Sequence, residues 1–412
     1  KINVTLTNTV GVTAPFVSSS SVSFQVFQTP TPFSGIKIEE CDDEESGVDD
    51  DGISVFDIDL DSFKRSLFIN PLDTTSPEVQ DFNEFEFNFS LYDNNDVLIS
   101  GPANSIDPKI SVENGYYIIS EISNPLSTAF TLSCESSVRV DFVVNPLPSF
   151  TVTSPQILCL NDLPLNISVE NPMDVYTYEW TNESGTILAT IDNINITSAG
   201  KYFVTATTTN GTLCSRTEII EVIESNIATL QNNFVTIIDE SNNIGSQNNL
   251  SISIDTLSND LGPGDYQFAI INTDNNERFP FAGFQDEPIF ENLEGGIYQI
   301  IVNDKNGCSP DATLLVSVIQ FPKFFTPNGD GQNDTWVVKG ANRTFYPNAS
   351  INIFNRFGKL VAQVPIDGQG WNGTYNGTLL PSDDYWYNVT LIPSDTTKPT
   401  INKKGNFSLL RK

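Results

Sequence analysis

The densest group of side chains that could bind a ligand is an acidic stretch near the beginning of the chain. Residues 39–52 read Glu-Glu-Cys-Asp-Asp-Glu-Glu-Ser-Gly-Val-Asp-Asp-Asp-Gly. Calcium ions prefer hard oxygen ligands, and glycine permits the tight turn of a cation loop. The order of residues is not that of an EF-hand, so a solvated acidic loop without metal is the alternative. The candidate Ca²⁺ ligands are Asp42, Asp43, Asp49, Asp50 and Asp51.

A second candidate loop lies at residues 328–334, which read Asn-Gly-Asp-Gly-Gln-Asn-Asp. Alternating Asp and Asn with two glycines resembles the first half of a calcium loop. The same composition is typical of a glycine-rich turn that leads into a strand, here at Thr335 and Trp336. We expect the turn, with metal binding as the alternative. No cofactor other than Ca²⁺ is expected.

Catalytic chemistry finds little support in the residue types. The chain contains no histidine, which excludes Ser-His-Asp and Cys-His nucleophiles and metal sites that need His. Carboxylate pairs occur throughout a chain with 52 Asp and Glu, so their spacing does not indicate glycoside hydrolysis. Trp371, Trp386 and Tyr387 could stack on a sugar, but aromatic residues in a strand-rich domain more often belong to the core. We therefore expect no enzyme.

The charge and hydropathy of the chain exclude further classes. A formal net charge of −32 repels phosphate backbones and anionic lipids, so we expect neither nucleic-acid binding nor binding to a membrane surface. No apolar run is long enough for a helix that spans a bilayer. The 28 Phe, 12 Tyr and 4 Trp supply enough apolar surface for several folded cores in 412 residues.

The elements that must position these groups are β-strands. Phe85, Phe87 and Phe89 alternate with polar residues, as do Leu250 and Ile252, which indicates strands with one buried face. Asn, Asp, Gly, Pro and Ser separate such runs, and no convincing long helix is present. The fold class we predict is all-β.

An internal repeat divides these strands into units. Gly200-Lys201-Tyr202 and Gly296-Ile297-Tyr298 each precede a strand, an Asn-Gly pair, a cysteine and one more strand, and Gly115-Tyr116-Tyr117 begins a looser copy. Proline-rich segments mark most junctions. The Cys, Trp, Tyr and Cys of the third unit resemble an immunoglobulin layout, although the second Cys lies beyond the Tyr strand. We predict tandem Ig-like β-sandwiches with the limits 1–28 (closing strands of a truncated upstream repeat), 29–146, 147–224, 225–320 and 321–412.

The five cysteines follow the repeat. Cys41 and Cys134 stand early and late in one unit, and Cys159 and Cys214 occupy the same places in the next. We predict the disulfides Cys41–Cys134 and Cys159–Cys214, with Cys308 as a free thiol. An oxidising compartment outside the cytoplasm follows from these disulfides. Five reduced, buried cysteines are the alternative.

The last hundred residues carry an ordered series of short motifs. The series is Phe325-Thr326-Pro327-Asn328-Gly329-Asp330-Gly331, Asn333-Asp334, Trp336, 353–361, Trp371-Asn372-Gly373-Thr374-Tyr375-Asn376-Gly377, Leu380-Pro381, Tyr385-Trp386-Tyr387 and 404–411. Residues 321–412 closely resemble the type B C-terminal sorting domain of the type IX secretion system, also called the gliding motility-associated C-terminal domain of Bacteroidetes. Asp383-Asp384 replaces a usual Gly, and Asn406 stands where His is frequent.

The resemblance implies a sorting-domain β-sandwich that the secretion machinery recognises. The implied partners are the type IX translocon, a PorV-like outer-membrane β-barrel shuttle and a PorP/SprF-like outer-membrane partner, with the protein secreted and attached at the outer membrane on the cell surface. An apolar final strand with a basic tip could make this contact, or it could complete the sandwich core. The candidate contact residues are Phe407, Leu409, Leu410, Arg411 and Lys412.

Three functions remain open at this point. The first is a non-enzymatic, adhesin-like, gliding motility-associated protein whose repeats form a stalk. The second is the stalk and sorting domain of a secreted polysaccharide-degrading enzyme with its catalytic domain upstream. The third is a Ca²⁺-dependent glycan-binding module centred on the acidic stretch at residues 39–52. Asp-Thr-Thr and Asp-Thr-Leu steps also resemble O-glycosylation acceptors of Bacteroidetes, which makes Thr74, Thr256 and Thr396 candidate glycosylation sites.

Overall fold

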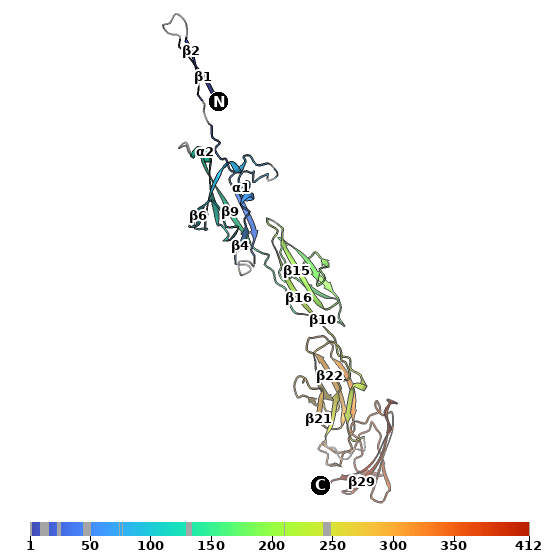
Figure 1. Ribbon diagram of the computed structural model, residues 1–412. Coiled ribbons are helices and arrows are strands. Elements are labelled where there is room, and N and C mark those ends of the chain that lie inside the picture. Colours follow the sequence, from blue (N-terminus) through green and yellow to red (C-terminus); the bar gives the residue numbers. More distant parts are fainter. Residues whose placement is uncertain are drawn as a thin grey trace. The chain divides into compact units, whose positions relative to one another are not determined.

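The computed structural model describes residues 2–8, 16–22, 26–43, 51–73, 75, 77–128, 134–209, 211–241 and 249–411. Strands dominate these residues (Figure 1), which confirms the all-β prediction. Helices in the described part are limited to the short segments α1 (Leu60–Ser66), α2 (Pro125–Thr128), η2 (Phe82–Glu84) and η3 (Asn232–Phe234). None of the helices in the described part is long and apolar enough to cross a membrane.

The chain divides into two compact units, whose division runs through the second sandwich. One unit consists of 1–153, 168–194 and 202–220, and the other of 154–167, 195–201 and 221–412. The strands β1 (Ile2–Asn8) and β2 (Phe16–Val22) form an antiparallel pair in the first unit.

The first sandwich contains a five-stranded sheet, in the order β3-β9-β8-β5-β6, and a two-stranded sheet of β4 and β7. Its core includes Phe85, Phe87 and Phe89, so the alternation in the sequence predicted the buried face correctly. The strands are β3 (Ile36–Cys41), β4 (Ile53–Asp57), β5 (Glu86–Tyr92), β6 (Leu98–Ala103), β7 (Lys109–Glu113), β8 (Tyr117–Ser123) and β9 (Glu135–Asn145).

The second sandwich has a five-stranded sheet, in the order β10-β16-β15-β12-β13, and the pair β11-β14. Trp180 is fully buried, and its indole Nε1–H donates a 2.8 Å hydrogen bond to the carbonyl of Ile191. The strands are β10 (Gln156–Cys159), β11 (Leu165–Ser168), β12 (Tyr176–Asn182), β13 (Ile187–Ala189), β14 (Asn193–Ile196), β15 (Gly200–Thr208) and β16 (Ser215–Ser225).

The third sandwich packs a three-stranded sheet, β17-β18-β21, and a four-stranded sheet, β20-β19-β22-β23, around one core. Leu250 and Ile252 are buried there, as their alternation with polar residues predicted. The strands are β17 (Val235–Ile238), β18 (Leu250–Ile254), β19 (Tyr266–Asn272), β20 (Arg278–Phe279), β21 (Ile289–Leu293), β22 (Gly296–Asp304) and β23 (Ala312–Val318).

The fourth sandwich has a five-stranded sheet, in the order β24-β30-β29-β25-β26, and the pair β27-β28. Its core is rich in aromatic side chains. The strands are β24 (Phe324–Phe325), β25 (Asn348–Phe354), β26 (Leu360–Gln363), β27 (Thr374–Tyr375), β28 (Thr378–Leu379), β29 (Asp383–Ile392) and β30 (Ile401–Leu409). The predicted domain limits stay a prediction, although no sheet of the described residues joins strands from two of the predicted units.

The two disulfides differ from the predicted pairs. Cys41 is bonded to Cys214 and Cys159 to Cys308, each within one compact unit, while Cys134 is a free thiol. The predictions that Cys41 pairs with Cys134, that Cys159 pairs with Cys214 and that Cys308 is free were therefore wrong. Each disulfide joins neighbouring sandwiches rather than two places in one sandwich.

The direction of the strands explains the error. β3 runs parallel to β9, so Cys41 at the end of β3 lies beside Asn145 at the end of β9. Cys134 directly precedes β9, an 11-residue strand that ends at Asn145. At roughly 3.3 Å per residue, Cys134 therefore lies about 35 Å from Asn145, and hence from Cys41. The Cα atoms of a disulfide lie only about 4.4–6.8 Å apart. Cys159 and Cys214 are separated in the same way by β16, because β10 also runs parallel to β16.

Tryptic peptide mapping under non-reducing conditions tests the disulfides directly, because each cysteine lies in a different tryptic peptide. We expect peptide 38–64 to be linked to 202–216, and peptide 140–201 to 306–323. Peptide 110–139, which carries Cys134, should take up an alkylating reagent in the isolated 412-residue chain. A link between 38–64 and 110–139 would show that the disulfides close inside single sandwiches instead.

Candidate functional site

The acidic stretch organises the start of β4. The carboxylate of Asp42 accepts a 2.8 Å hydrogen bond from the N–H of Gly52. The carboxylate of Asp43 accepts hydrogen bonds from the hydroxyl of Ser54 at 3.0 Å and the N–H of Val55 at 3.2 Å. Asp51 accepts a hydrogen bond from the N–H of Ile53 in the same way.

These contacts do not test whether the acidic stretch binds Ca²⁺, so calcium binding stays a prediction. Asp49 and Asp50, which belong to the predicted ligand set, lie outside the described residues. No group of three or more His, Cys, Asp or Glu suited to a metal ion occurs among the described residues. The described carboxylates Asp42, Asp43 and Asp51 each accept at least one hydrogen bond from residues 52–55, which lead into and begin β4.

The loop at 328–334 is a turn closed by one carboxylate. Asp334 accepts hydrogen bonds from the N–H groups of Asn328 at 2.9 Å, Gly329 at 2.7 Å and Gly331 at 2.8 Å. These main-chain donors lower the pKa of the Asp334 carboxyl group. Because both of its oxygens already accept hydrogen bonds from N–H groups, the described geometry is that of the expected turn.

The end of the chain forms the centre of the fourth sandwich. The ring of Phe407 stacks on Trp336 with a centroid distance of 4.4 Å. Trp371 and Phe325 approach the same ring at 6.0 and 5.8 Å. Strand β30 lies between the short edge strand β24 and the long strand β29, and Tyr385 on β29 is the register partner of Phe407.

The predicted contact residues at the end of the chain differ in how exposed their side chains are. Phe407 and Leu409 are 1% and 0% exposed, so the prediction that they contact a partner is wrong for the folded domain. Leu410 is 49% exposed and can make such a contact. Lys412 lies outside the described residues.

Arg411 is folded back onto its own domain. Its guanidinium donates hydrogen bonds to the carbonyl groups of Leu380 at 3.0 Å, Gly373 at 2.9 Å and Asn372 at 3.2 Å. Its main-chain N–H donates a 2.8 Å hydrogen bond to the hydroxyl of Ser382. The predicted basic tip is therefore partly used to hold the last residues in place.

A row of two exposed apolar side chains, Trp386 and Leu360, with the half-buried Phe354 between them crosses the outer face of the main sheet. Trp386 on β29 pairs with Phe354 on β25, which pairs in turn with Leu360 on β26. Trp386 and Leu360 are each 41% exposed, whereas Trp371 and Tyr387 are buried. The expectation of a core position thus holds for Trp371 and Tyr387 and fails for Trp386. Strict alternation along β29 could have revealed this, since Tyr385 and Tyr387 face inward.

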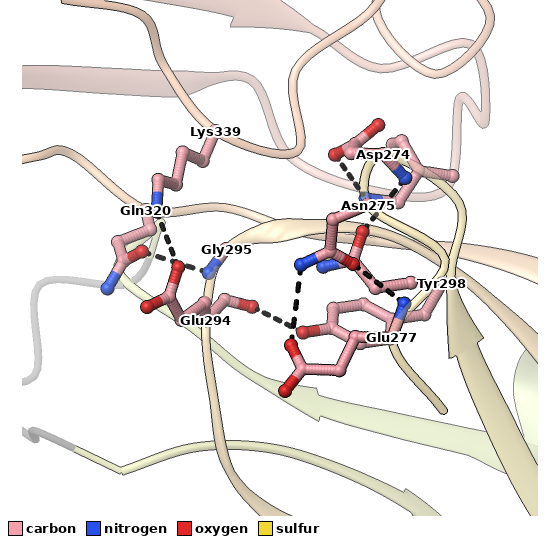
Figure 2. A network of polar contacts seen from close by, with 10 residues as sticks. Asp274, Asn275, Glu277, Glu294, Gly295, Tyr298, Gln320 and Lys339 are labelled. Atoms are coloured by element: carbon pink, nitrogen blue, oxygen red, sulfur yellow. Dashed lines mark hydrogen bonds and ion pairs between the residues drawn. The ribbon is translucent and has the colours of Figure 1, made fainter. Parts of the chain in front are cut away.

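Polar contacts attach the fourth sandwich to the third. The side chain of Gln320 accepts a 2.9 Å hydrogen bond from the N–H of Gly295, and its main chain exchanges two hydrogen bonds with Lys339. The ammonium of Lys339 lies 2.6 Å from the carboxylate of Glu294 (Figure 2). The carbonyl of Glu294 accepts a 2.9 Å hydrogen bond from the hydroxyl of Tyr298 (Figure 2). Residues of both sandwiches therefore share one polar network.

A second set of contacts fixes the connecting segment itself. The carboxylates of Asp239 and Glu240 accept hydrogen bonds from the N–H groups of Ile319 at 2.9 Å and Phe321 at 2.8 Å. Ile319 and Phe321 are buried in the core of the fourth sandwich. Carboxylates of the third sandwich thus accept hydrogen bonds from main-chain N–H groups at the start of the fourth sandwich. We therefore expect the third and fourth sandwiches to stabilise each other.

Two of the predicted glycosylation sites lie on exposed turns. Asp395 accepts hydrogen bonds from the N–H and the hydroxyl of Thr397, and Thr396 is exposed between them. Thr256 is exposed beside Asp255, which accepts hydrogen bonds from the following N–H groups. Thr74 lies outside the described residues. Glycosylation at all three positions stays a prediction.

Substitution of Phe407 tests its role in the core. We expect Phe407→Ala to lower the free energy of unfolding of the fourth sandwich by about 3–5 kcal/mol, as loss of a buried phenyl ring typically does. Denaturant unfolding followed by tryptophan fluorescence measures this change, because the rings of Trp336 and Trp371 lie beside Phe407. Leu410→Ala is the matched control and should change stability by less than about 0.5 kcal/mol. Equal effects of the two substitutions would contradict a core role for Phe407.

The buried tyrosines predict sensitivity to alkali. Burial raises the pKa of Tyr387 to about 12, and it also raises the pKa values of Tyr385 and Tyr346. In the unfolded chain the pKa of Tyr is about 10, so the folded state holds the phenol proton more tightly. The resulting stability is fully present below pH 10 and is lost as the pH rises through about 12.

Unfolding midpoints measured in urea between pH 8 and roughly pH 11.5 should therefore fall across the upper part of this range. Tyr387→Phe removes one titrating group and should make this decline shallower. An identical decline in the variant would exclude Tyr387 as a source of the alkaline effect.

Comparison with known proteins gives one specific match. Residues 319–409 match the model of the CHU_C Type IX secretion signal domain. No curated protein sequence matches the chain. The matched segment begins at Ile319, which is the residue where the fourth core begins.

Solved structures give only weak likenesses. Sidekick-1 immunoglobulin domains 1–5 are 10% identical over 92% of this chain and 80% of that chain, with a TM-score of 0.24. A Ca²⁺-stabilised adhesin that helps an Antarctic bacterium bind ice is 11% identical over 79% and 90%, also with a TM-score of 0.24. Two fibronectin type III domains of chicken tenascin are 11% identical over 41% and 98%, with a TM-score of 0.21. TM-scores this low carry no argument about fold or function.

The family match agrees with the ordered motifs of the last hundred residues and with the sandwich that they form. Residues 319–409 therefore form a sandwich that matches the CHU_C type IX secretion signal domain, which indicates export by the type IX secretion system.

Proposed function

We propose that this chain is part of a non-enzymatic, adhesin-like protein that the type IX secretion system exports and that stays attached at the outer membrane. The observation that carries the proposal is the secretion signal domain at residues 319–409. A PorV-like shuttle and a PorP/SprF-like partner would receive this domain. The preceding sandwiches would then form the stalk of the displayed protein.

The disulfides support a stalk. Cys41–Cys214 and Cys159–Cys308 each bond one sandwich to the next, so consecutive folded units are covalently joined outside their cores. Disulfides persist in an oxidising environment outside the cytoplasm, so they can hold the sandwiches of an exported stalk together. The polar network around Gln320 and Lys339 plays the corresponding role between the third and fourth sandwiches without a disulfide.

The exposed apolar row on the signal domain supports recognition of the folded domain. Trp386 and Leu360 lie on the outer face of the sheet, and each leaves 41% of its surface exposed. Exposed apolar groups that lie together usually mark an interaction site. We propose that this row, defined by Phe354, Leu360 and Trp386, contacts the secretion machinery, together with the exposed Leu410.

Export of a reporter tests the proposal. Residues 226–412 contain the third sandwich and the signal domain, so a fusion of a signal peptide, a reporter and 226–412 keeps their shared contacts. We expect the reporter outside the cell in a bacterium with a type IX system, and in the periplasm when the translocon is deleted. Retention in the periplasm of the intact strain would contradict export by this domain.

Variants of the same fusion test the apolar row. The double variant Trp386→Ser and Leu360→Ser should lower export several-fold while the domain still unfolds cooperatively at a similar temperature. Ile392→Ser is the matched control, because Ile392 is an exposed apolar residue on the same face at the far end of β29. Normal export of the double variant would place recognition on another surface of the domain.

A further inference from the structure

Cys134 is the one free thiol among the five cysteines, all of which lie within the described residues. It is half-buried and stands directly before β9, the last strand of the first sandwich. Cys214 stands in the same place before β16, and Cys308 stands shortly before β23. Both of these equivalent cysteines are bonded to a cysteine of the preceding sandwich.

The partner cysteine follows a rule in both disulfides. Cys41 lies beside Asn145, the last residue of β9, in the parallel pair of β3 and β9. Cys159 lies beside Ser225, the last residue of β16, in the parallel pair of β10 and β16. In each case the partner is therefore next to the residue where the main chain leaves a sandwich.

The last residue of each of these strands, Asn145 or Ser225, also contacts the loop that carries the bonded cysteine of the following sandwich. Asn145 donates a 2.9 Å hydrogen bond to the hydroxyl of Thr212, and its carbonyl lies 3.9 Å from the sulfur of Cys214. At the next junction, the hydroxyl of Ser225 donates a 2.7 Å hydrogen bond to the buried carboxylate of Asp304. The same carboxylate accepts a hydrogen bond from the N–H of Cys308.

Gln28 makes the corresponding contact at Cys134. The carbonyl of Gln28 accepts a 2.9 Å hydrogen bond from the amide group of Asn124, a buried residue. The N–H of Asn124 in turn donates to the carbonyl of Cys134. Gln28 also precedes Cys41 by about the same stretch of chain as Asn145 precedes Cys159. Gln28 therefore contacts the segment beside Cys134 through Asn124, as Asn145 contacts the loop of Cys214 through Thr212.

We propose that Cys134 is the bonding site for a further β-sandwich of the same kind, seated at Gln28, whose cysteine ends its first strand as Cys41 ends β3 and Cys159 ends β10. The other four cysteines of this chain are already bonded, so the partner cysteine is none of these. The two thiols lose two protons and two electrons as the S–S bond forms. The electrons reduce the disulfide of an exchange oxidant, such as a thiol–disulfide oxidoreductase, to two thiols.

The experiment is a disulfide map of the protein purified from the cells that produce it, with thiols alkylated at lysis. We expect most of tryptic peptide 110–139 to be linked to one peptide from outside residues 1–412 that carries a cysteine at the end of a strand-like sequence. The links 38–64 with 202–216 and 140–201 with 306–323 serve as internal controls.

Three outcomes would overturn the proposal. They are an alkylated Cys134, a Cys134 bonded to a small thiol, and a Cys134 bonded to Cys134 of a second copy. Cys134→Ser provides the matched variant, because it should abolish the new link and leave the two control links unchanged. Loss of the control links in this variant would show a general folding defect instead of a missing bonding site.

Discussion

Parallel pairing between the first and the last strand is the interaction on which most of this structure depends. It occurs in three of the four sandwiches, between β3 and β9, β10 and β16, and β24 and β30. In each case the last strand lies between the first strand and the preceding one, with hydrogen bonds on both sides. The main sheet of each of these sandwiches is complete only when its last strand is in place, because that strand supplies main-chain hydrogen-bond partners to two neighbouring strands.

The same pairing determines how neighbouring units are joined. A parallel pair brings the end of the first strand to the end of the last strand, which is where the chain continues into the next sandwich. A cysteine at the end of the first strand, such as Cys41, therefore lies next to the following sandwich. Each core must hold itself together by apolar packing, since both disulfides lie between sandwiches.

In the signal domain, this arrangement divides the final residues between two roles. Phe407 and Leu409 stabilise the domain from inside the sheet, and Arg411 satisfies carbonyl groups of the loop that ends at Leu380. The recognition by the secretion machinery that we propose therefore uses the surface of the folded domain. The apolar row of Phe354, Leu360 and Trp386 is formed by three adjacent strands, so it exists only after the sheet has formed.

The sequence by itself determined the features that depend on neighbouring residues. Alternation at Phe85, Phe87 and Phe89 predicted an all-β chain and its buried face, because successive side chains of a strand point to opposite sides. The ordered motifs between Phe325 and Arg411 identified the signal domain for the same reason, since each motif is a turn or strand of consecutive residues.

The tertiary structure alone decided which distant residues meet. The pairing of Cys41 with Cys214 instead of Cys134 follows from the parallel direction of β3 and β9, and no local pattern records the direction of one strand relative to another. The burial of Phe407 likewise depends on Phe325, Trp336 and Trp371, whose rings approach it from segments far away in the sequence.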